Sequence, residues 1–141
     1  MRVSASADPW DQPAVASCGF VVAFDRFEQE ALRPLARRYF GQELKAIDDI
    51  GVYSCRATRT GRESEHARGL AMDIAGFDLE DGRRILVKAE WGRRDNSGAF
   101  LRAVAGAACR YFNVVLTPDS DRDHLDHIHI DLGPYKLCVT R

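Results

Sequence analysis

Two stretches of the chain repeat apolar residues at the spacing of an amphipathic helix. In the first, four apolar residues stand between charged ones and predict a helix over about 22–40 that stops at Gly41. Pro34 lies inside this stretch, and proline removes a backbone donor, so the helix should kink or restart there. The four apolar residues are Phe24, Phe27, Ala31 and Leu32.

The second helix is expected over about 98–112. Asp95 or Ser97 can cap its N-terminus, because both side chains accept hydrogen bonds from free backbone N–H groups. Its apolar stripe should face the core. The stripe consists of Phe100, Leu101, Val104, Ala108 and Phe112.

Alternating polar and apolar residues predict two half-buried strands. Leu70, Met72 and Ile74 point one way in the first, which leaves Asp73 on the less apolar face. In the second, polar and apolar positions also alternate, as His127, Ile128, His129, Ile130, Asp131 and Leu132. Shorter strands are expected at 44–50 and 52–57, hinged at Gly51, and at 84–89, 113–116 and, as an edge strand, 135–139.

These elements predict an α+β fold, with a small, mainly antiparallel sheet and two principal helices in one domain. Loops are expected at 58–65 and 118–122, and Asp81-Gly82 has the composition of a hairpin turn. Residues 1–17 show little periodicity and are interpreted as an extended or mobile arm, which places the domain at 18–141.

Composition narrows the function classes. The chain has 141 residues, 45% of them hydrophobic, and a formal net charge of −1, so no global field favours nucleic acid. It has no apolar run of the roughly 20 residues that a membrane span needs. Its start lacks the basic and apolar regions of a signal peptide, so we expect either a targeting segment that has been removed or another export route.

The four cysteines favour disulfides. They stand at 18, 55, 109 and 138 without a Cys-x-x-Cys pair, which argues against a structural zinc knuckle. An even number spread along the chain favours two disulfides and an oxidising compartment over four buried thiols in the cytosol. From their expected positions we predict the pairs Cys55–Cys109 and Cys18–Cys138.

All four histidines fall in two short segments, 64–73 and 124–129. His66 comes just before the strand that carries Asp73, and His129 lies on the polar face of the second alternating strand. Two histidines and a carboxylate suit a catalytic zinc, which typically keeps three protein ligands and one open position. Asp73 has apolar neighbours, so its burial would be costly without a partner such as a metal.

The other residues of the second segment are candidates for proton transfer. His127 precedes His129 by two residues, so it shares a strand face and can approach a zinc-bound water without being a ligand. His124 can support a ligand or contact substrate. Asp126 is the weaker candidate base, because it points to the opposite face if the strand already includes it.

Each motif alone has an ordinary structural explanation. An isolated His-x-His pair is usually a feature of a surface strand, and only the agreement of the two strands favours a metal site. Arg56 is a candidate contact for a substrate carboxylate or oxyanion, with a structural salt bridge as an equal alternative. Ser64 is expected to hydrogen-bond backbone near His66 and is, with Arg56, a candidate substrate-binding residue.

The combined motifs resemble those of a known family. They are similar to the extensin-like C-terminal domain family, within the LAS zinc metallopeptidases (lysostaphin-type enzymes, D-Ala-D-Ala metallopeptidases and the hedgehog signalling domain). The second segment also resembles the penicillin-insensitive murein endopeptidases. The matching segments are Tyr53-Ser54-Cys55-Arg56, Ser64-x-His66-x-x-Gly69-x-Ala71-x-Asp73, Asp73-Ile74-Ala75-Gly76-Phe77 and His124-x-Asp126-His127-x-His129.

This resemblance, over roughly residues 18–141, implies a hedgehog or D,D-peptidase-like fold and one Zn²⁺ per chain on His66, Asp73 and His129. It also implies that His127 is the catalytic partner. Dipeptidases of the group carry a glutamate three residues before the last ligand, where this chain has the shorter Asp126. That departure favours His127 as the base and weakens the dipeptidase or carboxypeptidase interpretation.

The expected function is therefore hydrolysis of peptide bonds in peptidoglycan stem peptides or cross-links by a zinc metallopeptidase. We expect a monomer in the bacterial periplasm or elsewhere in the envelope, acting on wall peptides and not on plant extensin. A non-catalytic zinc module that binds wall peptide or protein is the first alternative. A D,D-carboxypeptidase, favoured by an enclosed pocket, is the second.

Overall fold

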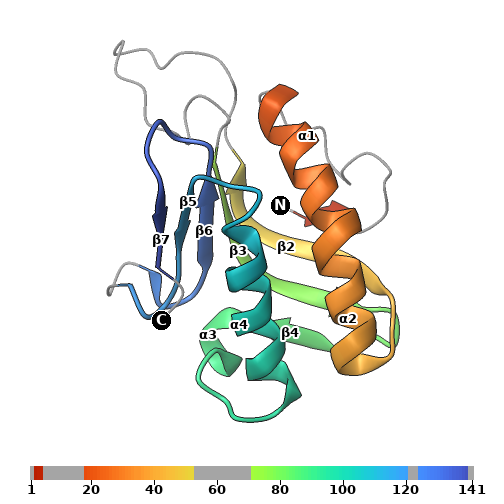
Figure 1. Ribbon diagram of the computed structural model, residues 1–141. Coiled ribbons are helices and arrows are strands. Elements are labelled where there is room, and N and C mark those ends of the chain that lie inside the picture. Colours follow the sequence, from red (N-terminus) through yellow and green to blue (C-terminus); the bar gives the residue numbers. More distant parts are fainter. Residues whose placement is uncertain (1, 5–17, 53–70, 121–123, 140–141) are drawn as a thin grey trace.

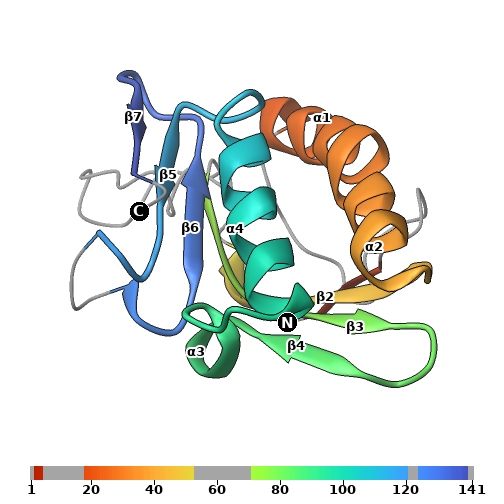
Figure 2. The ribbon, with the colours of Figure 1, turned by 60° about the horizontal axis from the view of Figure 1, so that its bottom comes forward.

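One face of a mixed sheet is covered by helices in the computed structural model, which describes residues 2–4, 18–52, 71–120 and 124–139 (Figure 1). The described strands form a seven-stranded sheet in the order β1-β2-β3-β6-β5-β7, and β4 pairs with β3 beside this path. Figure 2 shows α1, α2 and α4 on the same side of the strands. In chain order the elements are β1 (Arg2–Ser4), α1 (Cys18–Phe27), η1 (Glu28–Leu32), α2 (Arg33–Phe40), β2 (Leu44–Val52), β3 (Ala71–Leu79), β4 (Arg84–Leu86), α3 (Val87–Glu90), α4 (Asn96–Ala108), β5 (Val114–Leu116), β6 (Ile128–Asp131) and β7 (Leu137–Cys138).

The first helical layer runs from α1 through the π-helical segment η1 into α2. Pro34 lies in the first turn of α2, directly after the wider π turn, so the expected irregularity is present where the proline lacks its donor. The predicted stop at Gly41 is confirmed, because Gly41 has φ +65° and donates its N–H to the carbonyl of Arg37 at 2.8 Å. The helical run begins four residues earlier than predicted.

The second predicted helix is confirmed as α4. Of the two candidate caps, Asp95 is the N-cap: its Oδ1 accepts the N–H of Ser97 at 3.0 Å and that of Gly98 at 3.3 Å. All five residues of the predicted apolar stripe are buried, although Phe112 follows the end of the helix. They join the core between helices and sheet, in which Phe112 packs against Phe20, Phe24 and Phe27.

Strand β3 contains an irregularity that changes which residues face the helices. Met72 and Ile74 are buried in the core near its start, whereas Phe77 and Leu79 are buried in the core near its end. The pairing with β2 passes from Asp49 opposite Ile74 to Asp48 opposite Gly76 and skips Ala75. A bulge at Ala75 therefore moves the inward positions from even to odd numbers.

Three strand predictions differ from the structure. The two strands expected around Gly51 are one strand, β2, which has irregular pairing with β3 between Asp49 and Gly51 in place of the expected hinge. Residues 53–57 lie outside the described part. The strand expected at 84–89 ends at Leu86 and becomes α3, where the Glu90 carboxylate accepts the N–H of Leu86 at 2.7 Å. Residues 2–4 of the expected arm form β1, antiparallel to β2.

The turn and the last strand agree with the sequence. Gly82, with φ +92°, donates its N–H to the carbonyl of Leu79 in the connection between β3 and β4. β7 is an edge strand, as expected, but it pairs in parallel with β5. Every other pairing in the described sheet is antiparallel. None of the helices in the described ranges is long and apolar enough to cross a membrane.

Cys109 and Cys138 form a disulfide, with their Cα atoms 5.8 Å apart. The prediction of a disulfide is confirmed, but both predicted pairs, Cys55–Cys109 and Cys18–Cys138, are wrong, since each uses one of these two cysteines. The reason is topological. β7 pairs in parallel with β5, the strand that follows α4 in the chain, so Cys138 of β7 lies close to Cys109 at the end of α4. The sequence indicated an edge strand without indicating its neighbour.

Candidate functional site

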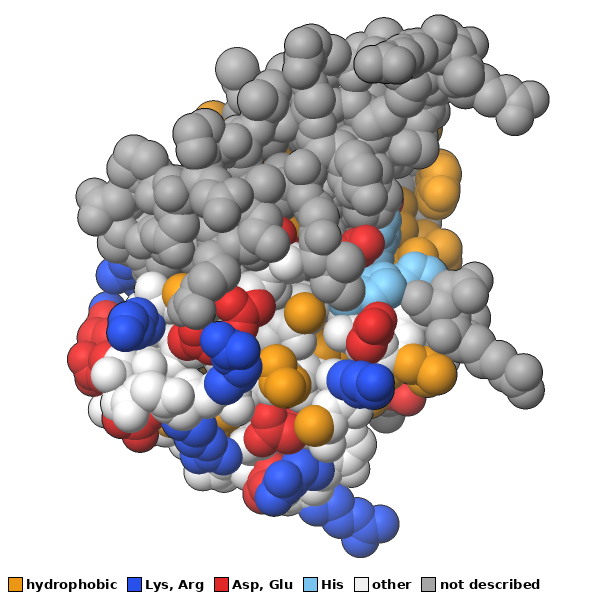
Figure 3. All heavy atoms as spheres, turned by 180° about the vertical axis from the view of Figure 1, so that it is seen from behind, with side chains coloured by type: hydrophobic (Ala, Val, Ile, Leu, Met, Phe, Trp, Pro, Cys, Tyr) orange, Lys and Arg blue, Asp and Glu red, His pale blue; other side chains and the backbone are white. Residues whose placement is uncertain are grey.

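The second histidine segment lies on the face of the sheet that the helices leave uncovered. Asp73 of β3 stands opposite His129 of β6, and directly opposed residues of an antiparallel pair project to the same face. Their neighbours Met72 and Ile130 are opposed in the same way and belong to the core on the helical side. Figure 3 shows histidine side chains on this face with acidic side chains beside them.

His129 is held between two carboxylates. Its Nδ1 lies 2.8 Å from Asp73 Oδ1 and its Nε2 lies 2.6 Å from Asp131 Oδ2. Asp131 is 3% exposed, and its other oxygen, Oδ1, accepts the N–H of Gly133 at 2.8 Å. A continuous chain of hydrogen bonds therefore fixes the His129 ring.

This arrangement favours the charged form of His129 in the metal-free protein. Burial alone lowers its pKa, but the hydrogen bonds to Asp131 and Asp73, with the charges of both carboxylates, outweigh burial and raise the pKa to about 9. Both ring nitrogens then donate to carboxylate oxygens. A metal bound at either nitrogen would replace a proton there.

His127 lies just before β6 and beside the same carboxylate. Its Nε2 is 3.8 Å from Asp73 Oδ1, and its Nδ1 is 2.7 Å from Asp126 Oδ1. Because the strand begins at Ile128, the condition that would turn Asp126 to the opposite face is not met. The hydrogen bond with His127, above all, holds the pKa of Asp126 below its usual range. Asp126 therefore orients the His127 ring and stays ionised.

His124 completes the group of imidazoles. Its ring centre is 5.0 Å from that of His127 and 6.0 Å from that of His129. The structure thus brings together five of the residues singled out in the sequence: Asp73, His124, Asp126, His127 and His129. The remaining candidates, Arg56, Ser64 and His66, and the cysteine Cys55, lie outside the described residues. Cys18 begins α1.

The donor atoms present have the right chemistry for zinc. Asp73 and His129 provide a carboxylate oxygen and an imidazole nitrogen in direct contact, and the hydrogen bond between them could be exchanged for two bonds to one metal. Within the ranges that the structure describes, no set of three or more His, Cys, Asp or Glu side chains forms a complete metal site. The third expected ligand, His66, lies outside those ranges.

Sequence reasoning missed two buried acids near the site. In the sequence, Asp131 is only one polar position of an alternating strand, although its place two residues after His129 puts it on the same face. Asp49 of β2 is 7% exposed; burial above all, and to a lesser degree the nearby carboxylates of Asp48 and Asp73, raise its pKa to about 6. A signal for Asp49 exists only in the doublet Asp48-Asp49, within a strand whose other residues, apart from Lys45, are apolar or glycine.

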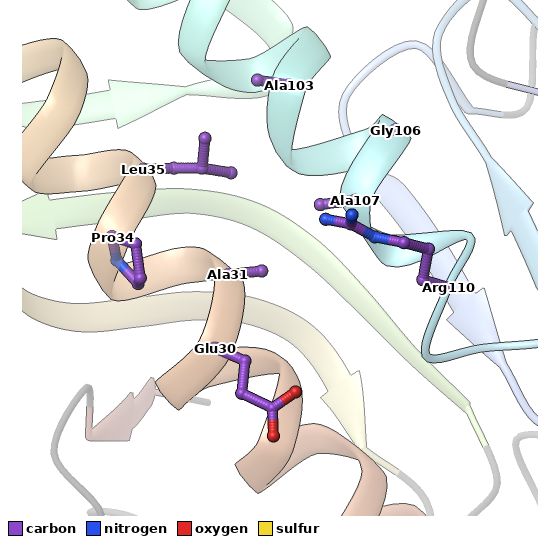
Figure 4. A pocket seen from close by; sticks show the side chains of 8 residues that line it. All are labelled: Glu30, Ala31, Pro34, Leu35, Ala103, Gly106, Ala107 and Arg110. Carbon is purple, nitrogen blue, oxygen red and sulfur yellow. The ribbon is translucent and has the colours of Figure 1, made fainter.

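A separate cavity of about 430 Å³ lies in the helical layer, between η1–α2 and α4 (Figure 4). Its lining is mostly small and apolar, with Glu30 and Arg110 as the charged groups. Glu30 already accepts the hydroxyl of Tyr111 at 3.0 Å and Arg26 Nε at 3.4 Å. The histidine cluster, with convergent donors and perturbed pKa values, is the stronger candidate for chemistry.

Comparison with known proteins identifies one family. The model for the extensin-like protein C-terminus matches residues 1–139. No curated protein and no solved structure matches the chain. The match includes all of the described site residues and both segments that hold the histidines.

Proposed function

This chain belongs to the extensin-like protein C-terminus family, and from that premise we propose that it is a zinc-dependent peptidoglycan endopeptidase of the LAS metallopeptidase group. It hydrolyses peptide bonds in bacterial wall stem peptides or cross-links. The disulfide between Cys109 and Cys138 supports a location in the periplasm or elsewhere in the envelope, because disulfides persist in oxidising compartments.

One observation carries the proposal: Asp73 and His129 meet across β3 and β6, with His127 beside them. Two segments that are far apart in the sequence thus bring the Asp73 carboxylate close to the imidazoles of His127 and His129. His66, Asp73 and His129 would hold the metal. Zinc bound there supplies Lewis-acid polarisation of a peptide carbonyl and activation of a water molecule.

His127 is the residue that moves the proton. When the neutral ring donates its Nδ1–H to Asp126, the lone pair is on Nε2, the atom that lies 3.8 Å from Asp73. Nε2 can therefore accept a proton from the attacking water and return it to the leaving amine. Asp126 holds the ring in this tautomer and stabilises its charged form.

The test is incubation of the protein with purified, cross-linked peptidoglycan, with and without a chelator, and identification of the products by mass. The proposal expects new peptide ends that disappear with chelator and return when zinc is added back. Val22→Ala, an exposed change on the helical layer, serves as the control for preparation and folding and should cleave at the wild-type rate.

The products separate the alternatives. Cleavage within cross-links supports the endopeptidase, whereas release of only a terminal D-amino acid supports the D,D-carboxypeptidase. A protein that contains zinc, binds wall peptides and yields no product would be a binding module.

A further inference from the structure

Asp131 is a buried acid whose two carboxylate oxygens each contact a different group among the described residues. One oxygen, Oδ2, faces His129 Nε2 at 2.6 Å, and the other, Oδ1, accepts the backbone N–H of Gly133 at 2.8 Å. The residue is 3% exposed, so it is shielded from a substrate. Burying a carboxylate costs free energy unless it is paired, and replacing such a buried pair by apolar residues is often neutral or stabilising. Stability alone therefore does not explain why Asp131 and His129 are buried together.

The contact with Asp131 decides which nitrogen of His129 is available. A neutral imidazole carries one proton, and the carboxylate on either side of the His129 ring can only accept it. A metal bound by both Asp73 and His129 would take the place of the proton at the nitrogen beside Asp73, so the remaining proton would be on Nε2, beside Asp131. The lone pair is then on Nδ1, the atom 2.8 Å from Asp73. Asp131 Oδ2, 2.6 Å from Nε2, is the acceptor that keeps the proton on this nitrogen.

We infer that Asp131 is a positioning residue that fixes the Nε2–H tautomer of His129 and so presents Nδ1, beside Asp73, as the metal-binding atom. The inference rests on the proposed function, since it assumes that His129 is a ligand. Partners that orient a ligating histidine typically contribute roughly 10–100-fold to metal affinity.

Gly133 makes Asp131→Asn a sharp test. The backbone N–H of Gly133 needs an oxygen, so the amide oxygen of the variant should face Gly133 and its NH₂ group should face His129 Nε2. That NH₂ group donates, which moves the ring proton to Nδ1. The variant keeps the shape of the side chain and reverses the tautomer.

The experiment uses the full chain and zinc alone, and it needs no substrate. Competition titration with a chromogenic chelator should show zinc affinity lower by roughly 10–100-fold in Asp131→Asn. Asp119→Asn is the matched control, because Asp119 also accepts a ring N–H, that of Trp91 at 3.0 Å, and it should leave the affinity unchanged. Wild-type affinity in a folded Asp131→Asn variant overturns the inference.

A second measurement covers the case in which the variant does not fold. Nitrogen-15 NMR of the zinc-loaded wild type should show His129 with a proton on Nε2 and the metal on Nδ1. Metal on Nε2 overturns the inference while leaving the zinc enzyme intact. A wild-type protein that binds no zinc overturns both it and the proposed function.

Discussion

The two faces of the β3–β6 pair differ sharply, although alternate residues of the same two strands form them. On the helical face, Met72, Ile74, Ile128 and Ile130 are fully buried in the core. On the other face, Asp73, His129 and Asp131 are also largely buried, but they are stabilised by hydrogen bonds to one another. One face obtains stability from apolar packing, and the other accepts the cost of buried polar groups, which indicates a function for them.

The largest expected effect comes from a substitution on the polar face, where loss of a ligand should remove the metal. Asp73→Ala should remove most of the zinc, about one per chain in the wild type, and with it all hydrolysis, because a ligand is lost. Elemental analysis of the purified variant measures this. Asp78→Ala is the control, since Asp78 lies on the same strand but pairs with Arg84 at 2.9 Å, and it should keep its zinc. Full zinc occupancy in Asp73→Ala would refute the ligand assignment.

Within the polar face, His127→Ala should retain zinc but lose hydrolysis by roughly 10²–10⁴-fold, because it removes proton transfer and no ligand. Rates on cross-linked muropeptides and zinc content should be measured on the same samples. His129→Ala should lose both zinc and activity, and His124→Ala should be milder than His127→Ala. If His127→Ala cleaves at the wild-type rate while Asp126→Ala is inactive, then Asp126 is the base.

On the helical face, the expected effect is on stability alone. Ile130→Ala should lower the free energy of unfolding by about 2–5 kcal/mol, because it leaves a cavity in the core. Chemical denaturation of the metal-free protein measures this. Leu137→Ala, at a position 43% exposed, should change stability by only about 0.5 kcal/mol or less. A variant Ile130→Ala that is as stable as the wild type would show that this face is not the core.

The smallest expected effect is at the cap of α4, in the helical layer and not on the strand pair itself. Asp95→Ala should cost about 1 kcal/mol, because two N–H groups of the first turn lose their acceptor. Asp25→Ala, an exposed aspartate inside α1, should cost less under the same denaturation conditions. Equal losses in the two variants would show that capping does not explain the effect at Asp95.

Local signals predicted the elements well. Gly41 and Asp95 act as the sequence indicates, because a cap depends on one residue and the backbone next to it. The alternation at 71–74 and 128–131 was also sufficient to place Asp73 and His129 on one face. These predictions needed only periodicity, which is a property of short segments.

Pairing between distant segments could not be predicted in the same way. Nothing near Cys138 indicates that β7 runs parallel to β5, and the disulfide depends on that neighbour. The bulge at Ala75 arises from the match between β2 and β3, so neither strand shows it alone. The contacts of Asp131 could not be predicted either, because they depend on Gly133 and on the orientation of the His129 ring, which the spacing of residues does not reveal.

The disulfide has a consequence for how a protease would act on this protein. Cys109 and Cys138 enclose β5, β6 and three of the four histidines in one covalent loop, whereas Asp73 lies outside it. A single cut inside the loop leaves both fragments joined, so the nicked chain migrates as intact protein until it is reduced. One half of the candidate site therefore stays tethered to the other after backbone cleavage, for as long as the surroundings remain oxidising.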